Sequence, residues 1–259
     1  MSNSVDINNM VWSYSRLDAF CKCKYSWFLN YIEHKPQIQN GFSLYGTMVH
    51  SILENWAKGV ILQHELAEEY FRQYYQCMTL PIPRMGQNDL NPKYFQRGLD
   101  YFLNFRGFGE KEIITSEYDF VYSYKGLRWR SIIDLLVKDD QDKVFLIDFK
   151  IWADSKTNTY MKEHVRQQYL YCIALWKFLK IVPDSIILEF PVRGDCYIEK
   201  FDSKRFHESE DWAFQTLDEI SKETEWAPTV DKTFCQCICG YREICEHCPK
   251  KEIKEMKNG

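Results

Sequence analysis

The order of apolar and polar positions divides the chain into a helical first part, a central part with strand-like alternation, and a mixed last part. Apolar residues recur at helical spacing in four segments, 13–33, 46–59, 63–79 and about 90–106. Residues 112–152 instead contain three strand-like runs, joined by turns at Lys125-Gly126 and at 138–143. The remaining predicted elements are a helix over about 159–180, strands near 185–193 and 196–202, and a helix over about 203–223.

This order predicts an α/β fold in which a central mixed β-sheet is flanked by helices. We expect one domain over residues 1–259, with a helical N-terminal part at 11–110 and a β-sheet core at 111–202. The last part, 203–259, would add a helix and a cysteine-rich tail.

The composition and charge argue against a membrane protein, a secreted protein and a strongly basic nucleic-acid-binding protein. The chain has 259 residues, 45% of them hydrophobic, and a net charge of −4, so nucleic-acid binding would need a local basic face or metal ions. The N-terminus lacks the pattern of a signal peptide, and no apolar stretch reaches the roughly 18 residues of a membrane span. We therefore expect an intracellular protein with no membrane contact, in which ten cysteines are not disulfides.

A charged pair interrupts the most apolar strand, "KVFLIDFKIW" at 143–152. Asp148 and Lys150 lie two residues apart, so their side chains project from the same face of the strand. Burying an unpaired charge costs several kcal/mol or more, which favours either a buried ion pair or a functional site. The decapeptide alone does not separate these two interpretations.

A second acidic residue lies on the preceding strand. Asp134, in "LRWRSIIDLLV", is joined to the Asp148 strand by a short turn, so the two strands are expected to be antiparallel neighbours. Two nearby carboxylates are costly unless a cation neutralises them, and oxygen ligands suit Mg²⁺ or Mn²⁺. The simpler alternative is that Asp134 pairs with Arg128 or Arg130.

An aspartate followed about a dozen residues later by Asp-x-Lys resembles the core motif of the PD-(D/E)XK nuclease superfamily. Further matches resemble its RecB-type branch, which includes helicase–nuclease subunits and the CRISPR-associated spacer-acquisition nuclease. These matches are "GTMVH" with His50, "QQYLY" with Gln167 and Tyr171, and an N-terminal helix containing a cysteine, with more cysteines far downstream. The chain departs from the branch at Ile151, often Thr or Ser there, and at Ser131, where a Gly or another small residue is common.

The resemblance implies a restriction-endonuclease-like core and a role for each matched residue. Metal binding would involve His50, Asp134, Asp148 and the backbone carbonyl of Phe149. Lys150 would orient or help deprotonate the attacking water and offset charge on the phosphate. The other implied members are Gln167 and Tyr171 lining the site, and Glu117 as only a further contributor. Glu54, one helical turn after His50, would be a partner of the imidazole if His50 holds the metal.

Each of these residues also has a simpler interpretation. His50 alone would be an ordinary helix histidine, and Gln167 and Tyr171 could belong to a helix surface and core. The combined match to the branch favours the catalytic interpretation for His50. For Gln167 and Tyr171 the two interpretations stay open.

Five of the ten cysteines are gathered in "CQCICGYREICEHC", 235–248. Thiolates at such spacing bind Zn²⁺ or an iron–sulfur cluster. The resemblance implies a [4Fe–4S] cluster held by Cys23, Cys239 and Cys245, with Zn²⁺ as the alternative metal. Gln236 occupies the position expected for the fourth ligand, so Cys235 is favoured there, with Cys237 or Cys248 as alternatives. The scattered cysteines are expected to be buried apolar residues: Cys77, Cys172 and Cys196.

The resemblance implies a Mg²⁺- or Mn²⁺-dependent DNA exonuclease acting on single strands or ends, in DNA repair or recombination. A helicase, a recombination protein or a CRISPR-type protein would be its partner, in a bacterial or phage-like cell. The alternatives are a non-cleaving DNA-binding or assembly subunit of the same fold, a zinc-containing structure-selective nuclease, and an RNA-directed nuclease.

Overall fold

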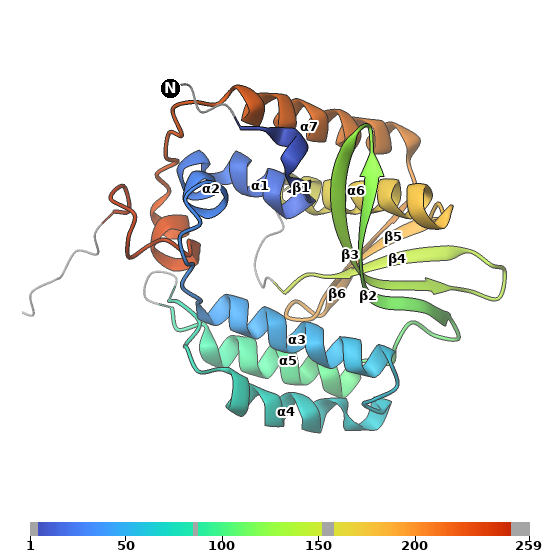
Figure 1. Ribbon diagram of the computed structural model, residues 1–259. Helices are drawn as coiled ribbons and strands as arrows, with labels where there is room; N and C mark the ends of the chain where they lie inside the picture. The colour runs from blue at the N-terminus through green and yellow to red at the C-terminus, as the bar shows by residue number, and fades with distance from the viewer. Residues whose placement is uncertain (1–4, 85–87, 152–157, 250–259) are drawn as a thin grey trace, which may run out of the picture.

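The computed structural model describes residues 5–84, 88–151 and 158–249 (Figure 1). The two ends of the predicted domain, 1–4 and 250–259, lie outside these ranges. Within the described residues, six strands form a single sheet. The strands are β1 (Val11–Trp12), β2 (Glu112–Tyr124), β3 (Leu127–Lys138), β4 (Val144–Phe149), β5 (Ser185–Phe190) and β6 (Asp195–Lys200).

The sheet is mixed, as the element order predicts. β3 pairs in parallel with the short β1 and antiparallel with both β2 and β4. β4 and β5 are parallel and are connected through helix α6 (Asn158–Leu179), and β6 returns antiparallel to β5. Only β1 was not predicted, because two residues are too few to show a period.

Helices cover both faces of the sheet (Figure 1). One face carries α3 (Gly41–Ala57), α4 (Leu66–Cys77) and α5 (Asn91–Asn104); the other carries α1 (Tyr14–Lys22), α2 (Lys24–Tyr31), α6 and α7 (Ser203–Lys222). Short helical turns lie at Ile7–Asn9, Gln63–Glu65 and Phe234–Ile238. None of the helices within the described ranges combines the length and apolar character needed to cross a membrane.

Strand alternation separates the core into two clusters. Leu135, Ile147 and Ile187 pack with the α3–α5 face, whereas Leu146 and Leu188 pack with the α6–α7 face. Because β4 contributes to both, it is buried on both sides, as its apolar run predicts. Asp148 therefore lies in a strand covered by two hydrophobic layers, and Lys150 follows directly after the end of that strand.

Two predicted helices begin or break differently in the structure. The 13–33 segment forms two helices separated at Cys23, and Ser13 caps the first by accepting a hydrogen bond from the Arg16 N–H. α3 begins at Gly41 rather than at residue 46, because Asn40 and Ser43 cap it reciprocally. The earlier start lengthens the helix that carries His50.

The expectation for the scattered cysteines was partly wrong. Cys172 is buried in the α6–α7 cluster, but Cys77 and Cys196 are exposed. Cys77 is the last residue of α4, and Cys196 lies on β6, where the burial alternates.

Candidate active site

The charged residues meet where β3 and β4 run side by side. The antiparallel pairing of β3 with β4 ends at Leu135 and Ile147, and Asp134 and Asp148 are the next residues beyond that end. The Oδ2 atom of Asp134 accepts a hydrogen bond of 2.9 Å from the Phe149 N–H, so the two strand segments are tied together at this point. The predicted proximity of Asp134 and Asp148 is thus present in the fold.

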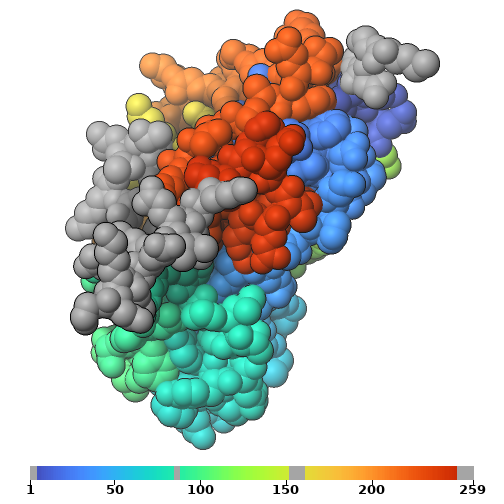
Figure 2. All heavy atoms as spheres, turned by 90° about the vertical axis from the view of Figure 1, so that its left-hand side faces the viewer, coloured from blue at the N-terminus to red at the C-terminus, as the bar shows by residue number. Residues whose placement is uncertain are grey.

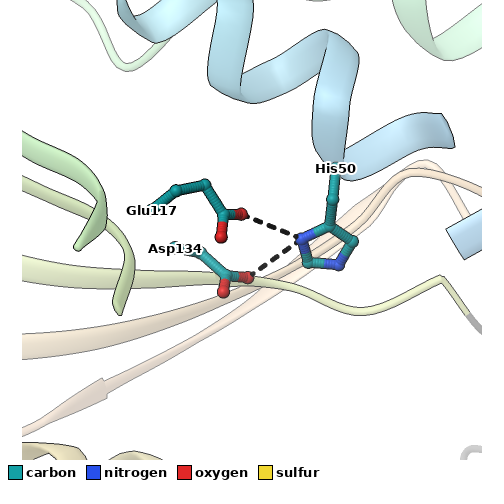
Figure 3. Close-up of side chains that lie close together, drawn as sticks. All are labelled: His50, Glu117 and Asp134. Atoms are coloured by element: carbon teal, nitrogen blue, oxygen red, sulfur yellow. Dashed lines mark ion pairs between the residues drawn. The ribbon is translucent and has the colours of Figure 1, made fainter. Parts of the chain in front are cut away.

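His50 reaches this point from α3 (Figure 3). Its Nδ1 atom lies 3.5 Å from Oε1 of Glu117 and 3.6 Å from Oδ2 of Asp134. The ligand atoms of these three residues all lie within 4.8 Å of one another, close enough to share one metal ion. One imidazole nitrogen and two carboxylates form a donor set that fits Mn²⁺ or Mg²⁺.

Glu117 is the member of this cluster to which the sequence assigned only a minor part. Ser116 pairs with Leu135 and Tyr118 with Ile133, so Glu117 lies directly opposite Asp134. Its φ of 44° is in the left-handed region, which costs on the order of 1–3 kcal/mol for a residue with a side chain. Such strain is concentrated at functional sites, and here the strained residue is one of the candidate ligands.

Asp148 and Lys150 begin a chain of polar contacts that ends in α6. Nζ of Lys150 lies 2.6 Å from Oδ2 of Asp148 and donates a hydrogen bond of 2.8 Å to Oε1 of Gln167. Nε2 of Gln167 donates in turn to the Tyr171 hydroxyl at 2.7 Å. Gln167 and Tyr171 therefore hold the lysine in place, and the structure brings all four predicted residues together.

Burial and the neighbouring charges shift the pKa values of Asp134, Asp148 and His50. Burial and the neighbouring Asp148 raise the pKa of Asp134 above its ordinary value. Burial also works to raise the pKa of Asp148, but the Lys150 ammonium outweighs it and lowers the pKa. Burial alone would lower the pKa of His50, but the charges of Asp134, Asp148 and Glu117 raise it to about 9. The cluster therefore attracts a cation, either a proton or a metal ion.

The arginine partners that were the simpler alternative for Asp134, and the contact of Glu54 with His50, are both absent among the described residues. Arg130 donates two hydrogen bonds to Asp119, at 2.8 and 2.6 Å, and Arg128 donates to the Asn9 carbonyl oxygen, so neither serves as the partner of Asp134. Glu54 forms an ion pair with Lys58, which caps the C-terminal end of α3, rather than supporting His50. The partners of His50 come from the sheet instead.

A cavity of about 380 Å³ opens beside His50 and Lys150. His50, Lys150 and Phe149 line one part of it, and Asn40 and Ile238 line another. Ile238 belongs to the cysteine-rich tail, and the Asn40 side chain donates a hydrogen bond to its carbonyl oxygen. The tail thus forms part of the wall beside the candidate active site.

The tail also brings cysteines from distant parts of the chain together. It packs against α2 (Figure 2), and one cavity there is lined by Cys23, Cys235, Cys239, Cys245 and Cys248. Backbone N–H groups donate to two of these sulfurs, from Ser26 to Cys23 at 3.5 Å and from Tyr241 to Cys239 at 3.4 Å. Such hydrogen bonds are common around metal-bound thiolates.

Cys237 is directed away from this cavity. Its sulfur donates to the Arg84 carbonyl oxygen at 3.7 Å, and it does not line the cavity. Burial raises the pKa of Cys239 to about 11, so a metal would have to displace its proton. Among the described residues, only His50, Glu117 and Asp134 bring three ligand atoms close enough to share one ion. A metal on the sulfurs therefore stays a prediction, and the cavity lining leaves Cys235 and Cys248 as the choices for the fourth ligand.

A sequence profile of the PD-(D/E)XK nuclease superfamily matches residues 11–246, nearly the whole described chain. The chain belongs to the PD-(D/E)XK nuclease superfamily. The crystal structure of a "putative exonuclease" from Eubacterium rectale matches with a TM-score of 0.53 and 12% identity, over 99% of this chain and 97% of that chain. This similarity supports the restriction-endonuclease-like fold.

A second solved structure, that of SSO0001, has 15% identity over 91% of this chain and 96% of that chain. Its TM-score of 0.35 is too low to support a conclusion. Among curated proteins, no sequence matches. Membership of the PD-(D/E)XK superfamily implies a metal-dependent nuclease, whereas the RecB-type branch stays a prediction.

Proposed function

We propose that this PD-(D/E)XK protein hydrolyses phosphodiester bonds in DNA with Mg²⁺ or Mn²⁺, as an exonuclease on single strands or ends. The observation that carries the proposal is the contact of His50 with Glu117 and Asp134 directly beside the Asp148–Lys150 pair. The exonuclease description of the similar Eubacterium rectale structure supports the choice of ends over internal sites.

We assign metal binding to His50, Glu117, Asp134, Asp148 and the Phe149 backbone carbonyl. A bound Mg²⁺ or Mn²⁺ ion supplies a Lewis acid and lowers the pKa of a coordinated water. Lys150, fixed between Asp148 and Gln167, is placed to orient the attacking water and to balance the charge that develops on the phosphate. Tyr171 keeps Gln167 in the orientation in which its carbonyl oxygen accepts from Lys150.

We assign a structural role to the cysteine cavity. A [4Fe–4S] cluster on Cys23, Cys239 and Cys245, with Cys235 or Cys248 as the fourth ligand, would join the first two helices to the tail, and Zn²⁺ is the alternative. Because Ile238 of the same tail lines the active-site cavity, a metal here would also fix one wall of that cavity. Helicase, recombination or CRISPR-type partners in a bacterial or phage-like cell remain predictions.

The test is cleavage of DNA labelled at the 5′ or the 3′ end, single- or double-stranded, by anaerobically purified protein with Mn²⁺. Short products that accumulate from one labelled end support an exonuclease, and the labelled end gives its polarity. Internal cleavage of a closed circular single strand would contradict the exonuclease assignment. Binding without cleavage would favour the non-cleaving subunit, and cleavage of RNA alone would favour the RNA-directed nuclease.

A further inference from the structure

A second cavity, of about 490 Å³, lies between α5 and the connection from β5 to β6. Three arginines line it: Arg97 from α5, Arg106 from the loop that follows α5, and Arg193 from the β5–β6 connection. We refer to it as the arginine cavity. Three guanidinium groups from separate segments around one cavity suit a ligand with negative charge.

Arg193 is the buried member of this group. Its side chain is only 13% exposed, and its guanidinium lies 4.1 Å from the centre of the Phe190 ring. Its Nη2 atom pairs with Asp195 at 2.8 Å, but Nε and Nη1 have no hydrogen-bond partner among the described residues. A buried charged donor without a partner is costly, and because these two nitrogens have almost no exposed surface, a ligand reaches them only if the Arg193 side chain moves.

Arg97 and Arg106 are exposed and are held by neutral groups. Arg106 donates to the carbonyl oxygens of Leu103 and Phe105, and Arg97 lies 3.5 Å from that of Val192. Within the described part of the chain, neither forms an ion pair with a carboxylate. Their positive charges therefore remain available to a ligand in the cavity.

Two carboxylates, Asp100 and Glu189, also line the arginine cavity. Burial raises the pKa of Glu189 to about 7, so near neutral pH this group carries only part of a negative charge. Asp195 already pairs with Arg193, so Arg97 and Arg106 face only Asp100 and the partial charge of Glu189, which leaves the cavity with a small net positive charge.

The arginine cavity adjoins the candidate active site. Tyr94 lines the active-site cavity, and Arg97, three residues later and about 4.5 Å further along the axis of α5, lines the arginine cavity. Between them, the Phe108 and Phe149 rings pack with their centres 6.2 Å apart. The Lys150 N–H donates to the Glu189 carbonyl oxygen at 2.8 Å, so the two cavities share a rigid wall.

We propose that the arginine cavity binds a phosphate group, supplied by the nucleic-acid strand next to the point of cleavage. This inference rests on the proposed nuclease function, because the strand is the natural source of a phosphate at this position. A free phosphate or nucleotide would offer the same chemistry, and the experiment separates the two sources.

The test uses Arg97→Gln, an exposed change, with Arg72→Gln on the neighbouring helix α4 as the matched control. Affinity for a fluorescent single-stranded oligonucleotide is measured in EDTA at several salt concentrations. Arg97→Gln should weaken binding of the oligonucleotide about tenfold relative to Arg72→Gln. In a plot of log affinity against log salt concentration, the slope for Arg97→Gln should be shallower by up to about 0.7. In cleavage, KM should rise while kcat is retained.

A second measurement does not depend on nuclease activity. Inorganic phosphate should raise the melting temperature of the wild type and of Arg72→Gln. The increase should be smaller for Arg193→Gln and for Arg97→Gln. Stabilisation by phosphate without an effect on oligonucleotide binding would assign the cavity to a free phosphate and overturn the strand as its source. Equal behaviour of Arg97→Gln and Arg72→Gln in both measurements would overturn the site itself. Wild-type protein that binds phosphate but cleaves no DNA would reject the nuclease proposal and keep the cavity.

Discussion

Replacing Lys150 by alanine would leave a negative charge buried without its partner. The Lys150 and Asp148 side chains are only 12% and 3% exposed, and their charged atoms lie 2.6 Å apart. Removing one member of such a buried pair costs about 3–5 kcal/mol, because the other charge stays in a poorly solvated place. Repulsion by the nearby Asp134 carboxylate adds to the cost of leaving Asp148 charged.

The loss of unfolding free energy cannot exceed the cost of protonating Asp148, because a neutral carboxyl no longer needs a charged partner. Protonating a carboxyl whose unfolded pKa is about 3.9 costs about 4 kcal/mol at pH 7 and about 1.5 kcal/mol at pH 5. In the wild type the lowered pKa of Asp148 stabilises the fold above about pH 3.9, and this contribution is lost only on acidification. In Lys150→Ala the pKa is raised, so the same group destabilises the fold increasingly as the pH rises above about 3.9.

We therefore expect Lys150→Ala to lose about 3–4 kcal/mol of unfolding free energy at pH 7 and about 1.5 kcal/mol at pH 5. The assay is urea unfolding in EDTA, followed by circular dichroism, at several pH values. Lys22→Ala is the matched control, since its pair with Asp18 is also 2.6 Å long but Lys22 is 49% exposed. That control should lose less than about 1 kcal/mol. A loss in Lys150→Ala that equals the control, or that does not change with pH, would refute the reasoning.

Three further predictions concern the metal sites and pH. Glu117→Gln should lower Mn²⁺ affinity about tenfold or more in calorimetric titration, because it removes a carboxylate ligand, and unchanged affinity would remove Glu117 from the site. Cys23→Ser should abolish the brown colour, iron and acid-labile sulfide of anaerobic protein, whereas Cys237→Ser should retain them; the opposite pattern contradicts the ligand set. In metal-free protein the raised pKa of His50 stabilises the fold fully below about pH 6.5, and this contribution is lost as the pH rises toward about 9. His50→Gln should therefore flatten that part of the stability–pH curve measured by urea unfolding, and an unchanged slope would contradict the charge assignment.

Strand periodicity predicted much of the site, because it fixes which side chains share a face. The two-residue spacing of Asp148 and Lys150 correctly predicted their contact, and the short turn after β3 correctly placed Asp134 beside Asp148. The position of Glu117 could have been found in the same way. A hairpin that turns at Lys125-Gly126 places residue 117 opposite residue 134 when the register is counted back from the turn.

Other features depend on tertiary contacts that periodicity does not encode. The Asp119–Arg130 pair forms across β2 and β3, so Arg130, one of the two alternative partners of Asp134, is engaged elsewhere. Glu54, one turn from His50 on α3, forms an ion pair with Lys58 at the C-terminal end of the helix, a contact that helical periodicity does not distinguish from one with His50. The cysteine spacing left three choices for the fourth ligand, and only the fold shows that Cys237 points away from the cavity.

The central claim is that the cluster of His50, Glu117 and Asp134 binds the metal that drives phosphodiester hydrolysis. The most direct test measures Mn²⁺ binding by calorimetry and cleavage of end-labelled single-stranded DNA on the same samples of wild type, Asp134→Asn and Glu54→Gln. Glu54 is the matched carboxylate, since it lies one turn from His50 but pairs with Lys58. We predict that Asp134→Asn loses both metal binding and cleavage while Glu54→Gln retains both. Cleavage by Asp134→Asn at the wild-type rate, with unchanged Mn²⁺ affinity, would contradict the claim.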